Sequence, residues 1–143
     1  MNETIFHVGV KGILMHDDKA LILQADSPSH GRYWDFPGGR VQEQESLQET
    51  LLREVTEEVP SLENISVGPL VHGARLTLLN DRDIGLVLFF FRISAAFTEI
   101  VLSEEHAGYQ WLAKEDVSAL EQDGSVRLTP ETEGAALKAA FSL

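Results

Sequence analysis

The feature that most constrains the fold is an alternation of strand-like segments with helical ones. Residues 84–94, "IGLVLFFFRIS", contain the longest apolar run, which suits a buried strand and is too short to span a bilayer. The remaining elements are expected as strands at 4–16, 20–25, 65–79 and 109–112 and as helices at 47–58, 114–120 and 130–141. Strands before, between and after helices predict an α/β fold, with a mixed β-sheet between helices that cover both of its faces.

The segments between these elements are expected to be irregular. Residues 26–32, "DSPSHGR", have the composition of a loop, and residues 80–83, "NDRD", that of a turn. In "YWDFPGGR", residues 33–40, a proline and two glycines argue against any regular structure. The last helix is expected to begin with Pro130 at its first helical position, where proline is favoured.

Length and composition limit the class of protein. A chain of 143 residues with 43% hydrophobic residues is expected to form one globular domain, spanning residues 1–143, with enough chain for a proper core. The absence of cysteine excludes disulfides, a thiolate metal site and a cysteine nucleophile. Because the amino terminus carries Glu3 and no long apolar run, no signal peptide is expected, and a cytoplasmic location follows.

The charge of the chain limits its partners. The formal net charge is −12, from 23 acidic and 11 basic residues, and the basic residues are scattered. This argues against a nucleic acid polymer bound through a basic surface. If the partner is a small anion, a cation has to lie between it and the protein.

The segment "LLREVTEEVP", residues 51–60, crowds three carboxylates into little more than one helical turn. Ser46 and Glu49 fit a capping box that opens this helix, and Pro60 closes it near Glu58. At 100° per residue, Glu54, Glu57 and Glu58 share an arc about 100° wide. A separate apolar stripe can face a core; it consists of Leu51, Leu52, Val55 and Val59.

This crowding has a cost that needs an explanation. Like charges three or four residues apart destabilise a helix by roughly 0.2–0.5 kcal/mol per pair, and carboxylates in its last turn oppose the macrodipole. One interpretation is a solvated acidic face. The other is a site for a hard divalent cation, which binds carboxylate oxygens and offsets both penalties. Because the acidic arc borders the apolar stripe, the two interpretations remain open at this point.

The spacing upstream of the helix resembles the Nudix box of MutT-like hydrolases, G-x5-E-x7-R-E-U-x-E-E-x-G-U, where U is a bulky aliphatic residue. The matching positions are Gly39, Glu45, Arg53, Glu54, Val55, Glu57 and Glu58. The stretches "WDFPGG" and "SEEHAGYQWL" are also similar to Nudix sequences, so the resemblance covers essentially the whole chain. Two positions depart from the box: Pro60 replaces its glycine and Ser61 its last aliphatic residue.

The resemblance implies a Nudix-type α/β/α sandwich and Mg²⁺-dependent hydrolysis, with Mn²⁺ as the alternative ion, of a nucleoside diphosphate linked to another group. It implies that Glu54, Glu57 and Glu58 bind the metal. Glu45 would supply a supporting carboxylate, and Arg53 would orient the glutamates. Gly38 and Gly39 would offer backbone contacts where a side chain would intrude.

Metal-assisted attack of water on a phosphoanhydride needs a proton acceptor. The resemblance implies that this general base is a carboxylate outside the box. Glu105 is the favoured candidate, with its neighbour Glu104 expected to point elsewhere. Glu54 is the candidate inside the box. The five histidines show no metal-ligand spacing and are expected at the surface or in the core, and Trp34 and Trp111 are expected to serve in packing.

Several alternatives stay open. A nucleoside triphosphate is slightly favoured as substrate over a nucleotide-sugar-like diphosphate, because the chain is short and lacks the markers of the ADP-ribose, diadenosine-polyphosphate and NADH subgroups. A homodimer is left open. A non-catalytic ligand sensor of the same fold would not need the intact glutamates, the related isopentenyl diphosphate isomerases use a cysteine that this chain lacks, and an acidic interaction domain would make the spacing an accident.

Overall fold

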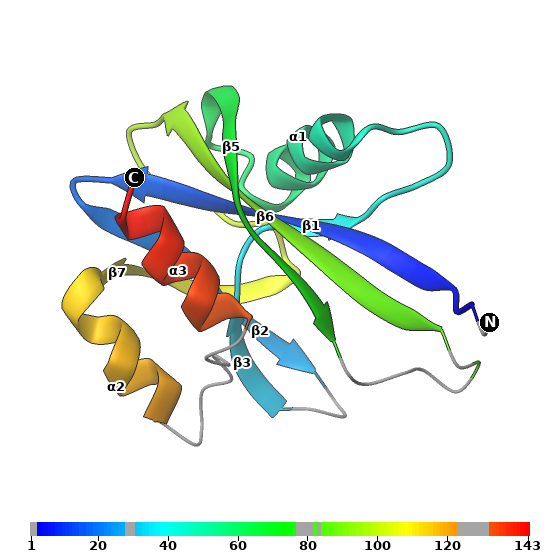
Figure 1. Ribbon diagram of the computed structural model, residues 1–143. Coiled ribbons are helices and arrows are strands. Elements are labelled where there is room, and N and C mark those ends of the chain that lie inside the picture. The colour runs from blue at the N-terminus through cyan, green and yellow to red at the C-terminus, as the bar shows by residue number, and fades with distance from the viewer. Residues whose placement is uncertain (1–2, 28–30, 77–81, 83, 123–131) are drawn as a thin grey trace.

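The computed structural model describes residues 3–27, 31–76, 82, 84–122 and 132–143 (Figure 1). Seven strands lie in these ranges: β1 Phe6–His16, β2 Lys19–Ser27, β3 Gly31–Asp35, β4 Gly38–Arg40, β5 Glu63–Leu76, β6 Gly85–Ala96 and β7 His106–Ala113. The helices are α1 Leu47–Glu58, α2 Val117–Gln122 and α3 Glu133–Phe141, with a 3-10 turn at Lys114–Asp116 before α2. No helix in the described ranges has the length and apolar character needed to cross a membrane.

The strands form a mixed sheet, as the alternation of elements predicts. The order is β3-β2-β1-β6-β5, with β4 also pairing with β1 and β7 with β2. Strands β1 and β6 run parallel, from Phe6 opposite Gly85 to Leu14 opposite Ile93, while every other pairing is antiparallel. The apolar run in β6 therefore lies inside the sheet, with β1 on one side and the edge strand β5 on the other.

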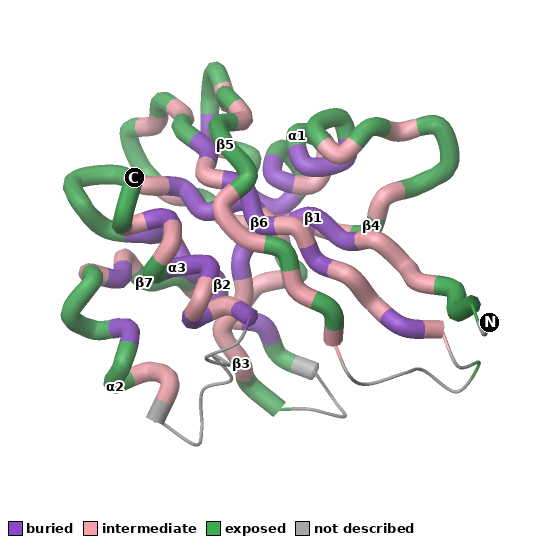
Figure 2. Tube along the Cα trace, viewed as in Figure 1, coloured by how far each residue is buried: buried purple, intermediate pink, exposed green. Residues whose placement is uncertain are grey.

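Helices cover both faces of the sheet, which confirms the α/β sandwich (Figure 1). Because successive strand residues point to opposite faces, Val10 and Leu14 of β1 pack on the α1 side while Ile13 packs on the side of α2 and α3. Each face thus has its own hydrophobic cluster. Figure 2 shows the buried residues concentrated between the helices and the sheet, and exposed residues along the outer side of α1.

Helix α1 begins and ends where its sequence signals predict. The Ser46 side chain accepts a hydrogen bond from the Glu49 backbone N–H, 3.1 Å away, and the helix ends at Glu58, two residues before Pro60. Its apolar stripe is narrower than predicted: Leu51, Val55 and Val59 are buried, but Leu52 is 45% exposed. Leu52 was placed wrongly because it lies at the margin of the stripe, where the sheet no longer covers the helix.

The expectation of irregular structure is wrong at residues 26–27, 31–35 and 38–40, holds at residues 36–37, and lies outside the described residues at 28–30. Strand β2 continues to Ser27, β3 pairs with it antiparallel, and the short β4 pairs with β1. Pro37 lies between β3 and β4 and breaks no ladder. The glycines help the pairing, because a Cβ at Gly38 would collide with the Val10 carbonyl oxygen.

Other bounds differ by a few residues. Strand β7 begins at His106, three residues before the expected start, because residues 106–108 pair with the end of β2. Helix α3 begins at Glu133, and Pro130 lies outside the described residues. The turn expected at residues 80–83 is described only at Arg82.

Candidate metal and catalytic site

The three carboxylates at the end of α1 differ sharply in exposure. The side chain of Glu57 is 60% exposed, that of Glu54 is 18% exposed and that of Glu58 only 10%. Glu58 is fixed through Oε2, which accepts a hydrogen bond of 2.8 Å from the Gly38 backbone N–H. The acidic arc therefore turns inward at Glu58, toward the short strand β4, and faces solvent at Glu57.

Arg53 ties the acidic groups around it together. Its Nε and Nη2 donate to the two oxygens of Glu45 at 2.8 and 3.0 Å, and Nη1 donates to Glu54 Oε1 at 2.9 Å. The same Nη1 lies 3.7 Å from Glu57 Oε2. The bidentate contact with Glu45 is a strong form of ion pair. The structure thus brings Arg53 between Glu45 and two of the glutamates of the arc.

Glu45 is held in its ionised form. The hydrogen bonds from Arg53 lower the pKa of Glu45 to about 2, and further bonds from the Thr50 hydroxyl and the Gln42 backbone N–H act in the same direction. The same carboxylate raises the pKa of Arg53. The Glu45 carboxylate therefore stays ionised well below neutral pH and holds the Arg53 guanidinium in place.

The ion pair between Glu45 and Arg53 is expected to contribute stability that the protein loses in acid. Because the pKa of Glu45 falls from 4.5 to about 2 on folding, its stabilising effect is present above about pH 4.5 and is lost as the pH drops toward 2. We expect Glu45→Gln to be less stable than the wild type at pH 7 and equally stable near pH 2. Urea unfolding of both proteins across this range measures the difference, and parallel curves would contradict the assignment.

Glu54 packs closely against Gly39 of β4. A Cβ at Gly39 would overlap its carboxyl group, so the glycine leaves free the space that this carboxyl group occupies beside β4. Burial raises the pKa of Glu54, Arg53 counteracts this rise, and repulsion from Glu58 and Glu57 adds to it. A cation bound beside these carboxylates would relieve that repulsion.

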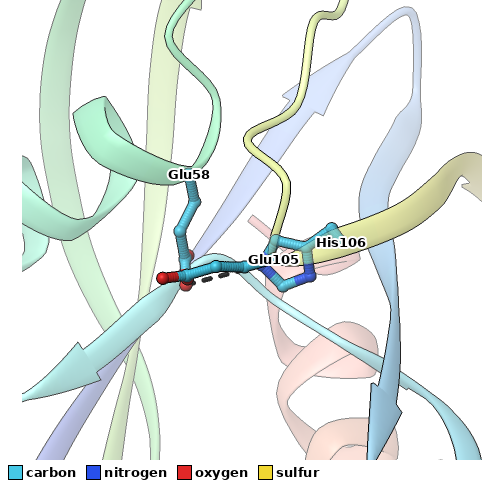
Figure 3. Close-up of side chains that lie close together, drawn as sticks. All are labelled: Glu58, Glu105 and His106. Carbon is cyan, nitrogen blue, oxygen red and sulfur yellow. Dashed lines mark ion pairs between the residues drawn. The ribbon is translucent and has the colours of Figure 1, made fainter.

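A second group of side chains meets the inner end of α1. Ligand atoms of Glu58, Glu105 and His106 all lie within 4.8 Å of one another (Figure 3). The approach is fixed by the backbone, since the Ser103 N–H donates to the Glu58 carbonyl oxygen at 2.9 Å. Glu105, the favoured general base, therefore lies next to the box helix, whereas Glu104 is not part of this group.

Lys11 and Asp35 form an ion pair on the other side of β4. The Lys11 Nζ lies 2.8 Å from Asp35 Oδ2, and Asp35 Oδ1 accepts a bond from the Phe36 backbone N–H. Burial opposes the charge on Lys11, but Asp35 and, more weakly, Glu58 outweigh it, so the pKa of Lys11 is raised. The pair thus places a cation within electrostatic reach of the carboxylate site.

Breaking this pair is expected to destabilise the protein. The two side chains are only 16% and 21% exposed, so Lys11→Met would leave the Asp35 charge largely desolvated, at a cost of about 2–3 kcal/mol. The double variant Lys11→Met with Asp35→Asn is expected to recover much of that loss, because asparagine still accepts the bond from Phe36. Urea unfolding of both variants measures this, and an unaffected single variant would contradict it.

The donor set fits a divalent cation of the kind that takes carboxylate oxygens. Glu54 and Glu58 are mostly buried and are close enough to repel each other, and in the described part of the chain Arg53 and Lys11 are the cationic side chains that act on them. Such a cluster matches what Mg²⁺ or Mn²⁺ requires.

Sequence reasoning missed three residues near the site. His106 was expected at the surface or in the core, and the Lys11–Asp35 pair was not expected at all. The signal for His106 was its place directly after Glu105, in a stretch that already resembled Nudix sequence. The expectation that the tryptophans pack agrees with the structure: Trp111 stacks on Phe97 at 5.7 Å, and Trp34 packs against the core.

Comparison with known proteins independently supports the resemblance to the Nudix family. A family model described as "NUDIX domain" matches residues 5–131. The chain is 33% identical over 60 residues to an 8-oxo-dGTP diphosphatase of Proteus vulgaris, which is 41% of this chain and 54% of that protein. It is 29% identical over 111 residues to an uncharacterized Nudix hydrolase of Bacillus subtilis (strain 168), covering 76% of this chain and 66% of that protein. The alignments thus span about half and about two thirds of these curated relatives.

A solved structure shares the fold. The MutT protein from Methanosarcina mazei Go1 superimposes with a TM-score of 0.75 at 20% identity, covering 99% of this chain and 98% of that one. At this identity the likeness establishes the architecture, which agrees with the mixed sheet and its two helical layers.

Proposed function

Since the chain belongs to the family of NUDIX domains, we propose that it hydrolyses a nucleoside diphosphate linked to another group, with Mg²⁺ or Mn²⁺ as cofactor. The observation that carries the proposal is the buried Glu58 carboxylate, anchored by the Gly38 N–H and lying beside Glu105. A structural acidic face would not need to bury a carboxylate next to a second one.

The residues divide the work as follows. Glu54, Glu57 and Glu58 would hold the cation, and Arg53, clamped by Glu45, would keep Glu54 and Glu57 oriented. When bound, the ion would offset the charge of the diphosphate and polarise water so that it can attack phosphorus near neutral pH. Glu105 would accept the proton of the attacking water. Gly38 and Gly39 would keep β4 free of side chains that would fill the space beside the glutamates.

We favour a nucleoside triphosphate as substrate over a nucleotide-sugar-like diphosphate. The partial similarity to an 8-oxo-dGTP diphosphatase supports this. The proposal includes one domain over residues 1–143, a cytoplasmic location and a small-molecule partner in place of a nucleic acid polymer. A homodimer remains an expectation that sedimentation can test.

A nucleotide panel tests the function directly. The purified protein is incubated with Mg²⁺ and nucleoside triphosphates, nucleotide sugars or ADP-ribose, and the phosphate products are identified. Release of a nucleoside monophosphate is the expected result. If no substrate is turned over while the folded protein binds metal, the sensor becomes the better interpretation, because a sensor binds its ligand without hydrolysis.

Metal binding should also stabilise the fold. An ion that binds only the native state raises stability by about 2.7 kcal/mol at a concentration about 100 times its Kd, which corresponds to several degrees in Tm. We expect millimolar Mg²⁺ to raise the melting temperature of the wild type and to have little effect on Glu58→Gln. Identical midpoints for the wild type with and without the ion, even with a substrate analogue present, would contradict a metal site on α1.

A further inference from the structure

His106 is a buried side chain whose polar atoms lack hydrogen-bond partners. The side chain is only 8% exposed, and within the described residues neither ring nitrogen makes a hydrogen bond. Buried polar side chains in proteins nearly always have such a partner. An imidazole left in this state points to a partner of another kind.

The surroundings of the ring indicate what that partner is. His106 Nε2 lies 3.5 Å from Glu58 Oε1, whereas Glu58 Oε2 is already occupied by the Gly38 N–H (Figure 3). The Glu105 carboxylate completes a group whose ligand atoms lie within 4.8 Å of one another. Ligands of one metal ion at about 2.0–2.2 Å lie about 3–4 Å apart, so a small side-chain rotation would bring this group to coordination distance.

We propose that His106 is a nitrogen ligand, through Nε2, of a divalent ion that it shares with Glu58 Oε1. Glu105 borders this ion and keeps its carboxylate available to accept a proton. The inference rests on the proposed metal dependence of the site and adds a donor that the carboxylate arc lacks. Because imidazole suits transition metals while Mg²⁺ prefers oxygen ligands, the site should favour Mn²⁺ or Co²⁺ over Mg²⁺.

The competing explanation is structural: a histidine that only pairs with Glu58 and supports the start of β7. The two differ in what happens to the metal. A structural histidine leaves the coordination sphere of the ion entirely to oxygen, whereas a ligand contributes a nitrogen that magnetic resonance can detect.

The experiment uses the full chain with Mn²⁺ alone and no nucleotide. Pulsed electron paramagnetic resonance of bound Mn²⁺ is expected to show modulation from a directly coordinated ¹⁴N, which changes to the ¹⁵N pattern when the protein is made with ¹⁵N-histidine. His106→Asn should abolish the nitrogen signal and weaken Mn²⁺ binding by about tenfold or more, with a smaller effect on Mg²⁺. His16, an exposed histidine at the end of β1, provides the matched control. His16→Asn should keep both the nitrogen signal and the Mn²⁺ affinity of the wild type.

The labelling step keeps the test decisive even if His106→Asn does not fold, because it needs only the wild-type chain. Bound Mn²⁺ without a histidine nitrogen signal would overturn the inference while leaving the proposed hydrolase intact, since turnover with Mg²⁺ is measured separately. A folded protein that binds no Mn²⁺ would overturn the inference and the proposed metal site together.

Discussion

Replacing Glu58 by glutamine is expected to lower kcat about a thousandfold while leaving the fold intact. The charge of a metal ligand contributes to the several kcal/mol by which a bound ion stabilises the transition state, and a loss of about 4 kcal/mol corresponds to a factor of about 10³. The carbonyl oxygen of glutamine can still accept the bond from the Gly38 N–H, so the buried anchor survives. Loss of activity would therefore report the charge and not the packing.

Stability without metal should hold or rise slightly in this variant. Glu58 repels Glu54, and removing one charge from the arc relieves that repulsion. Glu57→Gln should lower kcat in the same way, although the Glu57 side chain is exposed and lies 3.7 Å from the Arg53 guanidinium. The matched control is Glu49→Gln in the first turn of α1, away from the site, which should turn over normally. Near wild-type kcat for Glu58→Gln at saturating Mg²⁺ would rule out the ligand assignment.

The features that sequence reasoning predicted well are those set by local rules. The start of α1 depends on the Ser46 cap and its end on Pro60, and both act within a turn of the helix. The two residues that depart from the box, Pro60 and Ser61, follow α1 and leave its carboxylates in place. The Ser61 hydroxyl accepts a bond from the Val101 N–H, so the position that departs from an aliphatic residue still ties down the loop before β7.

The features that it missed depend on partners distant in the chain. Strand β3 is recognisable only once β2 lies beside it, and β4 only because Gly38 allows it to approach β1. Lys11 and Asp35 are 24 positions apart, and no periodicity in either segment predicts that they meet. A charged residue inside a strand is predicted to be exposed unless its ion-pair partner on another strand is known.

The candidate site also combines contacts between residues near in the chain with contacts between distant segments. Arg53 and its glutamates lie on or beside one helix, so their spacing already placed them together. His106 reaches Glu58 only because the loop before β7 bonds back to the end of α1 through the Ser103 N–H. That contact between distant segments is what turns an acidic helix end into a mixed nitrogen and oxygen environment.

The general base gives the second large expected effect. Glu105→Gln should lower kcat by about 10²–10⁴-fold, the usual contribution of a positioned proton acceptor. Glu105 lies immediately before β7 and within the group formed with Glu58 and His106, and this place beside the proposed metal ligands is the reason we expect it to act as the base. Glutamine retains a neutral oxygen donor, so Mn²⁺ affinity should stay within a few fold of the wild type, unlike in His106→Asn.

Glu104 provides the matched control, since it has the same chemistry one position earlier and lies outside that group. Glu104→Gln should leave kcat nearly unchanged, because Glu104 and Glu105 are both exposed turn residues but only Glu105 brings its carboxylate to Glu58 and His106. Single-turnover kinetics on both variants, with metal affinity measured alongside, separates the outcomes. If Glu104→Gln carries the loss, the loop places the base one residue earlier. If neither variant loses activity, Glu54 becomes the candidate for the base.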